Sequence, residues 1–168
     1  MFKGKEKYII GFSIIFVLFS FLFVFGPLRF PSKAYLASNT IPNADNVTKE
    51  ITANIVVEEK FRCENDSISR LAIIFNKMRD TGSNVVFEIR QDNNVIFSDI
   101  VNTNQINDQH RLFINCNING INNKELTLRI YSYDKLDTGL ALMVNNDADA
   151  RIKFGSSNIS GTICFSIE

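Results

Sequence analysis

The sequence predicts an all-β domain, an antiparallel sandwich or barrel, preceded by one N-terminal transmembrane helix. Two observations lead to this class. From Ile51 onward, apolar and polar residues alternate with a period of two, and turns rich in Asn, Asp and Gly separate the alternating runs. Before that point, residues 8–25 form an unbroken apolar run. Short strands with one apolar face, and no helical stripe between them, are typical of an antiparallel sandwich or barrel.

The apolar run comes first in the chain. Its 18 residues, YIIGFSIIFVLFSFLFVF, contain no charged side chain. At ~1.5 Å per residue such a helix spans roughly 27 Å, close to the thickness of the bilayer hydrocarbon, and Pro27 ends it. A cleaved signal peptide also has basic residues before an apolar core. However, this run exceeds the usual ~7–15 residues and no A-x-A cleavage site follows it directly. We therefore expect an uncleaved membrane anchor.

Charge divides the chain into the same two parts. Its 18 basic and 18 acidic side chains balance, but residues 1–33 carry a net +4 and residues 34–168 a net −4. The zero total, with no clustered basic excess, argues against nucleic-acid binding. The positive-inside rule favours a cytoplasmic N-terminus at residues 1–7, a transmembrane helix at 8–25 and an extracytoplasmic C-terminal domain. Residues 26–50, with all three Pro and little periodicity, are expected to be a linker before the β domain at 51–168.

Eight or nine strands are expected in the β domain. Five alternating runs carry their apolar residues at one parity, and the sheet interior is expected at these positions: Ile55, Val57, Phe61 and Cys63; Leu71, Ile73 and Phe75; Val85, Phe87 and Ile89; Leu112 and Ile114; Leu126, Leu128 and Ile130. A turn at 92–94 makes 95–101 the return strand of a hairpin. The apolar run 138–144, the short run 151–154 and the C-terminal alternation of Ile163, Phe165 and Ile167 complete the set.

The residues that carry most enzyme chemistry are sparse. His110 is the only histidine, and we interpret it as a polar residue at a loop–strand junction rather than a base or metal ligand. Glycoside hydrolysis needs two carboxyl groups that face each other across a cleft. Glu58 and Glu59 are neighbours on a strand and should point to opposite faces. With no GxSxG motif and no phosphate-binding glycine loop, the sequence favours a non-catalytic protein.

Oxygen-rich turns and three cysteines leave alternatives open. The segments 92–94 and 145–151 offer clustered Asn and Asp oxygens that calcium prefers, although these residues also form turns without a metal. No other cofactor is indicated. Cys63 and Cys116 share the parity of core residues, so either a disulfide between them or two buried thiols fits the pattern. Cys164 opposes Ile163 and Phe165 and is expected to point outward.

Polar and aromatic side chains at the opposite parity supply the candidate ligand-binding face. A sugar ligand needs an aromatic ring and planar polar groups, such as arginine donors, on an exposed surface. The alternative is a solvated face with ordinary cross-strand pairs. The candidate residues are Glu88, Arg90, Arg111, Phe113, Arg129 and Tyr131.

The stretch from Asn54 to about Val144 carries a family resemblance through the runs IVVEEKF, DSISRLAIIF, NVVFEIRQDNNVIFSDIV, INDQHRLFIN and KELTLRIYSYD. It resembles the extracytoplasmic β-sandwich domain attached to some bacterial multi-pass membrane glycosyltransferases and related surface-polysaccharide proteins. The resemblance implies a jelly-roll fold like that of carbohydrate-binding modules. Those enzymes have many membrane spans and catalytic acidic residues, whereas this chain has one expected span, so glycosyltransferase activity does not carry over.

These observations predict a membrane-anchored, non-catalytic module that is displayed outside the cell on a single span. It would bind cell-envelope glycan or assist surface-polysaccharide assembly, with polysaccharide or a membrane glycosyltransferase as partner. The alternative is a structural or assembly subunit that docks to a membrane protein. The expected span has no GxxxG motif, which weakens pairing through the helix without excluding association with a different protein.

Overall fold

A computed structural model describes residues 35–37, 40–106, 111–146 and 150–168. All of them belong to one unit, Ser32–Glu168. The predicted transmembrane helix at 8–25 lies outside the described residues, as does His110. Within the described ranges, no helix is long and apolar enough to cross a membrane.

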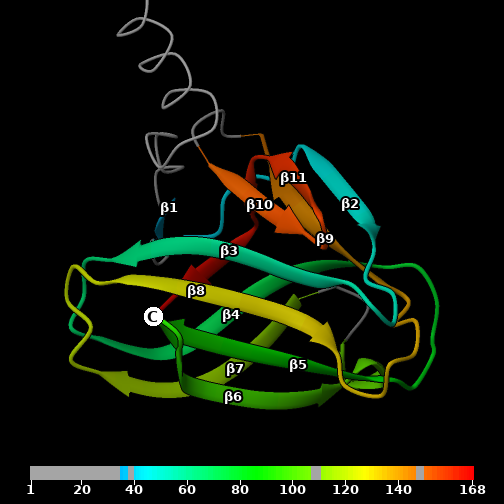
Figure 1. Ribbon diagram of the computed structural model, residues 1–168, viewed down its shortest axis with the longest axis horizontal. Coiled ribbons are helices and arrows are strands. Elements are labelled where there is room, and N and C mark those ends of the chain that lie inside the picture. The colour runs from blue at the N-terminus through cyan, green and yellow to red at the C-terminus, as the bar shows by residue number, and fades with distance from the viewer. Residues whose placement is uncertain (1–34, 38–39, 107–110, 147–149) are drawn as a thin grey trace, which may run out of the picture. The chain divides into compact units, whose positions relative to one another are not determined.

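The described chain is all-β, as predicted, and its strands form two sheets. The first sheet has the order β11-β10-β3-β8-β5-β6, with β1 added to β3 as a parallel strand. Figure 1 shows β3, β8, β5 and β6 running side by side. The bounds are β1 Tyr35–Ala37, β3 Val56–Cys63, β5 Asn84–Gln91, β6 Asn94–Asn102, β8 Glu125–Ser132, β10 Arg151–Phe154 and β11 Ser157–Ser160.

The second sheet is antiparallel throughout and contains the order β12-β9-β4-β13. Two further strands join it, β2 beside β9 and β7 beside β4. The bounds are β2 Asn46–Glu50, β4 Ser67–Lys77, β7 Arg111–Asn119, β9 Leu140–Asn145, β12 Thr162–Ile163 and β13 Phe165–Ile167. A short 3-10 helix, η1 Thr103–Gln105, follows β6.

The strand runs that the sequence predicts are present, including the short run 151–154, but the structure adds strands that the sequence pattern did not show. The expected linker 26–50 was wrong in part, because β1 and β2 lie within it. Strand β2 has no buried residue and is held by its pairing with β9, so it has no apolar alternation to read. Strand β11 is likewise mostly exposed and pairs with β10. The run 162–167 is split into β12 and β13 by a bend at Cys164.

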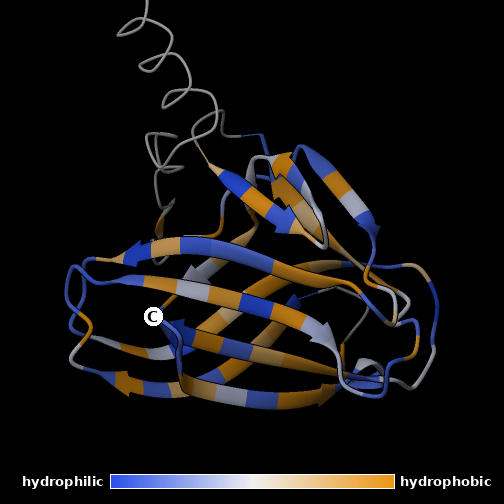
Figure 2. Ribbon diagram, in the orientation of Figure 1, coloured by the Kyte–Doolittle hydropathy of each residue, from blue (hydrophilic) through white to orange (hydrophobic). Residues whose placement is uncertain are grey.

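The core lies between the inner faces of the two sheets and contains the predicted apolar positions. Two edge-to-face aromatic pairs connect the sheets, because each pair takes one ring from each sheet. Phe61 and Phe165 have ring centroids 5.3 Å apart, and Phe75 and Phe87 have centroids 6.0 Å apart. Figure 2 shows the alternation of hydrophobic and hydrophilic residues along β3 and β8 that aims one set of side chains at this core.

The C-terminal segment departs from simple alternation. Cys164 was expected to point outward, and this prediction was wrong, because the residue is fully buried. Its amide donates to the carbonyl of Met143 on β9, and its own carbonyl accepts from Ile74 on β4. The segment lies between β4 and β9, and both its parities are buried. Alternation does not distinguish inside from outside in a strand that is covered on both faces.

Candidate functional site

The outward face of the first sheet holds a row of charged side chains. Register places Lys153 on β10 beside Glu58 on β3, Glu58 beside Arg129 on β8, and Arg129 beside Glu88 on β5. Side chains at one parity share a face, so four consecutive strands present these residues in one line. The row is a direct consequence of strand pairing.

Arg129 is at the centre of the row and joins three strands. Its Nε lies 2.8 Å from Glu58 Oε1, an ion pair without the alignment of a hydrogen bond, and its Nη1 donates to Glu88 Oε2 at 3.0 Å. The guanidinium carbon lies 5.6 Å from the ring centroid of Tyr131, two residues along the same strand. A planar, permanently charged guanidinium suits such simultaneous contacts with carboxylates and a ring.

Glu88 is 7% exposed and accepts from three side chains. Arg90 Nε donates to Glu88 Oε2 at 2.9 Å and the Tyr131 hydroxyl donates to Oε1 at 2.7 Å, in addition to Arg129. Burial raises the pKa of Glu88, but the hydrogen bonds from Tyr131 and Arg90 and the charges of Arg90 and Arg129 outweigh it, so the pKa lies below its usual value. Glu88 is therefore ionised at neutral pH.

Glu58 is held in the same way. Burial raises its pKa, while the hydrogen bond and charge of Lys153 and the charge of Arg129 together lower it by more, so this pKa is also depressed. Lys153 Nζ donates to Glu58 Oε2 at 2.8 Å. The pKa of Tyr131 is raised, first by burial and then by its hydrogen bond to Glu88. The face therefore presents ionised carboxylates and a protonated phenol as hydrogen-bonding groups for a ligand.

The structure brings four of the six predicted ligand-binding residues together and separates the other two. Glu88, Arg90, Arg129 and Tyr131 form one network, in which the other three side chains donate to the Glu88 carboxylate. Arg111 and Phe113 lie on β7, which belongs to the second sheet. There the Phe113 ring contacts Arg70 of β4, with 5.1 Å between the guanidinium carbon and the ring centroid. The alternation of apolar and polar residues predicted which side chains of these strands point outward, but it could not predict which sheet each strand joins.

Sequence reasoning missed two members of the cluster, Glu58 and Lys153. The sequence placed Glu58 and Glu59 on opposite faces, which the structure confirms, but it gave no partner for either residue. The outward parity of Lys153 was readable from Ile152 and Phe154, which point into the core. What could not be read was the pairing of β10 with β3, which joins residues 95 positions apart.

Glu59 points inward and is 1% exposed. Its Oε2 accepts from the amide of Ile163 at 2.7 Å, and its Oε1 is hydrogen-bonded to the Thr162 hydroxyl. Burial raises the pKa of Glu59 to about 8, and the hydrogen bonds from Thr162 and Ile163 lower it by less. The carboxyl group thus joins β3 of the first sheet to β12 of the second in its neutral form. It has no access to solvent or ligand.

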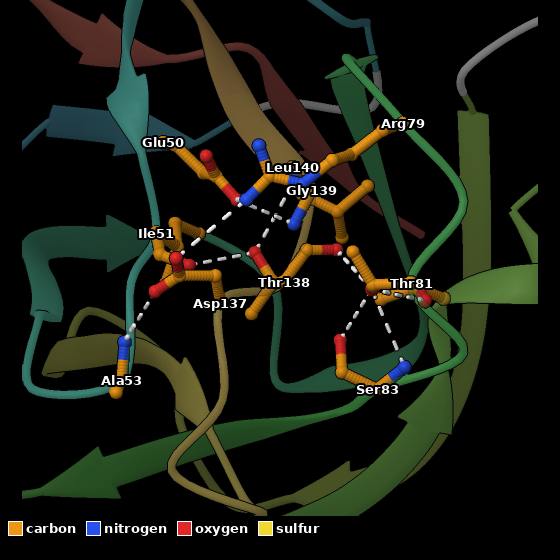
Figure 3. Close-up of polar contacts among 11 residues, drawn as sticks. Glu50, Ile51, Ala53, Arg79, Thr81, Ser83, Asp137, Thr138, Gly139 and Leu140 are labelled. Carbon is orange, nitrogen blue, oxygen red and sulfur yellow. Dashed lines mark hydrogen bonds and ion pairs between the residues drawn. The ribbon is translucent and has the colours of Figure 1, made fainter.

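A second polar cluster occupies the loops at one end of the sheets (Figure 3). Glu50 Oε1 accepts from Arg79 Nη2 at 2.7 Å and from the amide of Gly139 at 2.8 Å. The Thr138 hydroxyl donates to the carbonyl of Ile51 and accepts from the amide of Leu140. Gly139 has φ +70°, and a Cβ there would lie 2.4 Å from the carbonyl oxygen of Arg79. These contacts hold loops together through backbone groups, so we assign this cluster a structural role.

The cysteines and the predicted calcium segments complete the sequence-based candidates. Cys63, Cys116 and Cys164 are buried free thiols, so no Cys63–Cys116 disulfide is present. Asp92, with φ +55°, lies in the turn between β5 and β6. Residues 147–149 of the other predicted segment lie outside the described residues. Among those that are described, no three His, Cys, Asp or Glu side chains are grouped to hold a metal. Calcium binding stays a prediction.

Comparison of the chain with known protein families, curated proteins and solved structures finds no match.

Proposed function

We propose that the protein is a membrane-anchored, non-catalytic module whose extracytoplasmic, jelly-roll-like β-sandwich binds cell-envelope glycan or assists surface-polysaccharide assembly. The proposed anchor is a transmembrane helix at residues 8–25, with residues 1–7 in the cytoplasm. The family resemblance in 54–144 supports the module type. The observation that carries glycan binding is the cluster of Arg129, Tyr131, Glu58 and Glu88 on an outward sheet face.

The contacts on this face suit sugar recognition. Arg129 and Tyr131 place a planar donor and an aromatic ring together, and both are fixed by Glu88. Groups that are held in place before binding lose less entropy when a ligand arrives. Glycan recognition of this kind needs neither a metal nor a group that exchanges protons.

The test is binding of the full-length protein, in nanodiscs of zwitterionic lipid, to an array of envelope glycans. We expect at least one glycan to bind, and we expect Arg129→Gln to weaken its binding. Arg70→Gln, which removes a positive charge from the other sheet, should bind like the unmodified protein. Failure of the folded protein to bind any envelope glycan would contradict the proposal.

The second candidate is an assembly subunit that docks to a membrane protein. The observation in its favour is a set of exposed apolar side chains on two loops, Met78, Tyr133 and Leu136, each more than half exposed at 58–59%. Isolated surface apolar residues are common, whereas several on neighbouring loops are typical of a protein contact. Crosslinking in native membranes separates the two candidates, because a docking subunit should be captured together with a specific membrane protein. A Tyr133→Ser/Leu136→Ser variant should no longer form this crosslinked complex.

A further inference from the structure

The outward face of the first sheet carries an excess of positive charge on a domain that is otherwise acidic. We call this surface the cationic face. Its strands point six basic and three acidic side chains outward, in β3, β5, β8 and β10. They are Lys60, Arg62, Arg90, Arg129, Arg151 and Lys153, with Glu58, Glu88 and Glu125. The rest of residues 34–168 has seven basic and fourteen acidic side chains. The charge of this face is thus opposite to that of its surroundings.

The three carboxylates of the cationic face do not neutralise all of its cations. Glu58 pairs with Lys153 and Arg129, and Glu88 with Arg90 and Arg129. Glu125 lies opposite Arg62 in the sheet register, yet its carboxylate is bonded to Lys60 at 2.7 Å.

The surplus is concentrated where β3 meets β10. Arg62 and Arg151 are exposed and make no ion pair within the described residues. Lys153 lies opposite Glu58, and the same register places Arg151 opposite Lys60. The Lys60 and Lys153 side chains point to the same face and are 56% and 60% exposed. Four cations therefore lie on two adjacent strands, and β3 pairs in turn with β8, which carries Arg129 and Tyr131. Exposed cations without a full complement of acidic partners are available to an anionic ligand.

The geometry fits an extended ligand that crosses the strands. Neighbouring strands lie about 4.8 Å apart, so β10, β3, β8 and β5 together span roughly 14 Å. Each of the four strands carries at least one outward basic side chain: Lys153 on β10, Lys60 on β3, Arg129 on β8 and Arg90 on β5. Guanidinium groups bind carboxylate or phosphate oxygens through paired, directional hydrogen bonds. Tyr131 lies two residues from Arg129 on the same face of β8, and its ring contacts the Arg129 guanidinium.

We propose that the cationic face binds an acidic polysaccharide, one whose repeating unit carries carboxylate or phosphate groups. This inference rests on the proposed function and narrows the class of glycan. Arg62 and Arg151 make the primary contacts with the ligand's anions, and Lys60 and Lys153 support them. The acidic remainder of the domain repels the same ligand and so confines it to this face.

The experiment is calorimetric titration of the full-length protein, in nanodiscs of zwitterionic lipid, with four probes. These are oligogalacturonate, phosphorylated dextran, unmodified dextran of the same length, and single-stranded DNA; vesicles of anionic phosphatidylglycerol are tested separately by flotation. We expect one of the two anionic glycans to bind, more weakly as salt rises, and dextran not to bind. Binding of oligogalacturonate would identify carboxylate as the anionic group that is recognised, and binding of phosphorylated dextran would identify phosphate.

Two double variants localise the binding. Arg62→Gln/Arg151→Gln removes two positive charges from the cationic face and should weaken binding roughly tenfold. Arg70→Gln/Arg111→Gln removes the same charge from the second sheet and should change affinity less than twofold. Unchanged near-ultraviolet circular dichroism shows that both variants fold.

Each other outcome overturns the inference in a distinguishable way. Equal, salt-insensitive binding of dextran and oligogalacturonate contradicts the acidic ligand but leaves glycan binding intact. No binding to these probes or to any glycan of the array contradicts the proposed function as well. Equal weakening by both double variants assigns the effect to net charge rather than to this face. Tighter binding to DNA or to anionic vesicles than to either acidic glycan replaces the polysaccharide with that partner.

Discussion

Glu58 and Glu59 are neighbours on β3, yet strand geometry places them in opposite environments. Glu58 points outward to Arg129 and Lys153, and the pKa of its carboxyl group lies below the usual value, because these cations outweigh the effect of burial. Glu59 points into the core, where burial raises its pKa to about 8 and where it is hydrogen-bonded to the neutral groups of Thr162 and Ile163. Two adjacent residues of one strand thus carry an ionised carboxylate and a neutral carboxylic acid.

The difference separates the two roles of the first sheet. Its inward side determines how strongly the two sheets hold together, and its outward side presents fixed charges to solvent and ligand. The outward and inward carboxyl groups should therefore contribute to the pH dependence of stability in opposite directions. A depressed pKa, as in Glu58 and Glu88, contributes stability that is lost as the pH falls through that pKa. A raised pKa, as in Glu59, contributes stability that is complete at acidic pH and is lost as the pH rises.

The largest expected effect is on the inward side of β3. Phe61→Ala removes a fully buried ring that contacts Phe165 of the second sheet. We expect the free energy of unfolding to fall by about 3–5 kcal/mol, because lost burial and a cavity both contribute. Urea denaturation measures it. The matched control is Lys60→Ala, one residue away on the outward side, which should change the same quantity by about 0.5 kcal/mol or less. Similar losses in the two variants would contradict the division of roles.

The next effect tests Glu59 itself. Its pKa is about 8 in the folded protein, whereas an ordinary glutamate side chain in water has a pKa of 4.5, so between these values the folded state holds a proton that the unfolded state has released. Stability should therefore fall as the pH rises from about 5 to 8, by up to about 1.4 kcal/mol per unit. Glu59→Gln mimics the neutral acid and should flatten this slope while leaving stability near pH 5 little changed.

Denaturation curves at several pH values check this expectation. The control is Glu58→Gln, which should leave the slope between pH 5 and 8 in place and instead reduce the loss of stability below pH 4.5. Parallel pH profiles for the unmodified protein and Glu59→Gln would show that Glu59 does not retain its proton.

A smaller loss is expected at the centre of the outward cluster. Arg129→Met preserves much of the side-chain volume but removes the cation shared by Glu58 and Glu88. The arginine side chain is only 19% exposed, and two partly buried carboxylates lose a partner. We expect a loss of about 2 kcal/mol in the free energy of unfolding. Lys153 and Arg90 remain beside the carboxylates and limit the loss. An unchanged midpoint in urea would show that these two neighbours suffice.

Much of the fold could be predicted because, in a strand with one buried face, apolar residues alternate with polar ones along the sequence. Leu126, Leu128 and Ile130 on β8 are all fully buried, at the parity that the sequence indicated. The pattern failed where burial does not alternate. Strand β2 is held by backbone pairing with little burial, and the C-terminal segment around Cys164 is buried on both faces.

The candidate site could be predicted only as a set of outward positions. Alternation placed Arg129 and Tyr131 on one face of one strand, and the structure agrees. It could not show that Arg111 and Phe113 belong to the other sheet, because strand order depends on contacts between residues far apart in sequence. For the same reason it could not join Lys153 to Glu58, or the inward Glu59 to Thr162.

The smallest expected effect concerns the second sheet, where another arginine contacts an aromatic ring and a carboxylate. Arg70 lies against Phe113, and its Nε donates to Glu168 Oε2 at 2.9 Å, but the arginine and glutamate side chains are 43% and 39% exposed. Arg70→Met should therefore lower the free energy of unfolding by about 0.5 kcal/mol, against about 2 kcal/mol for Arg129→Met, because water replaces the lost cation at an exposed carboxylate. Urea denaturation at low and high salt measures both. The Arg70 effect should nearly vanish at 1 M salt, where exposed pairs are screened, whereas most of the Arg129 effect should persist. If the two substitutions prove equally costly and equally sensitive to salt, burial is not what distinguishes the two clusters.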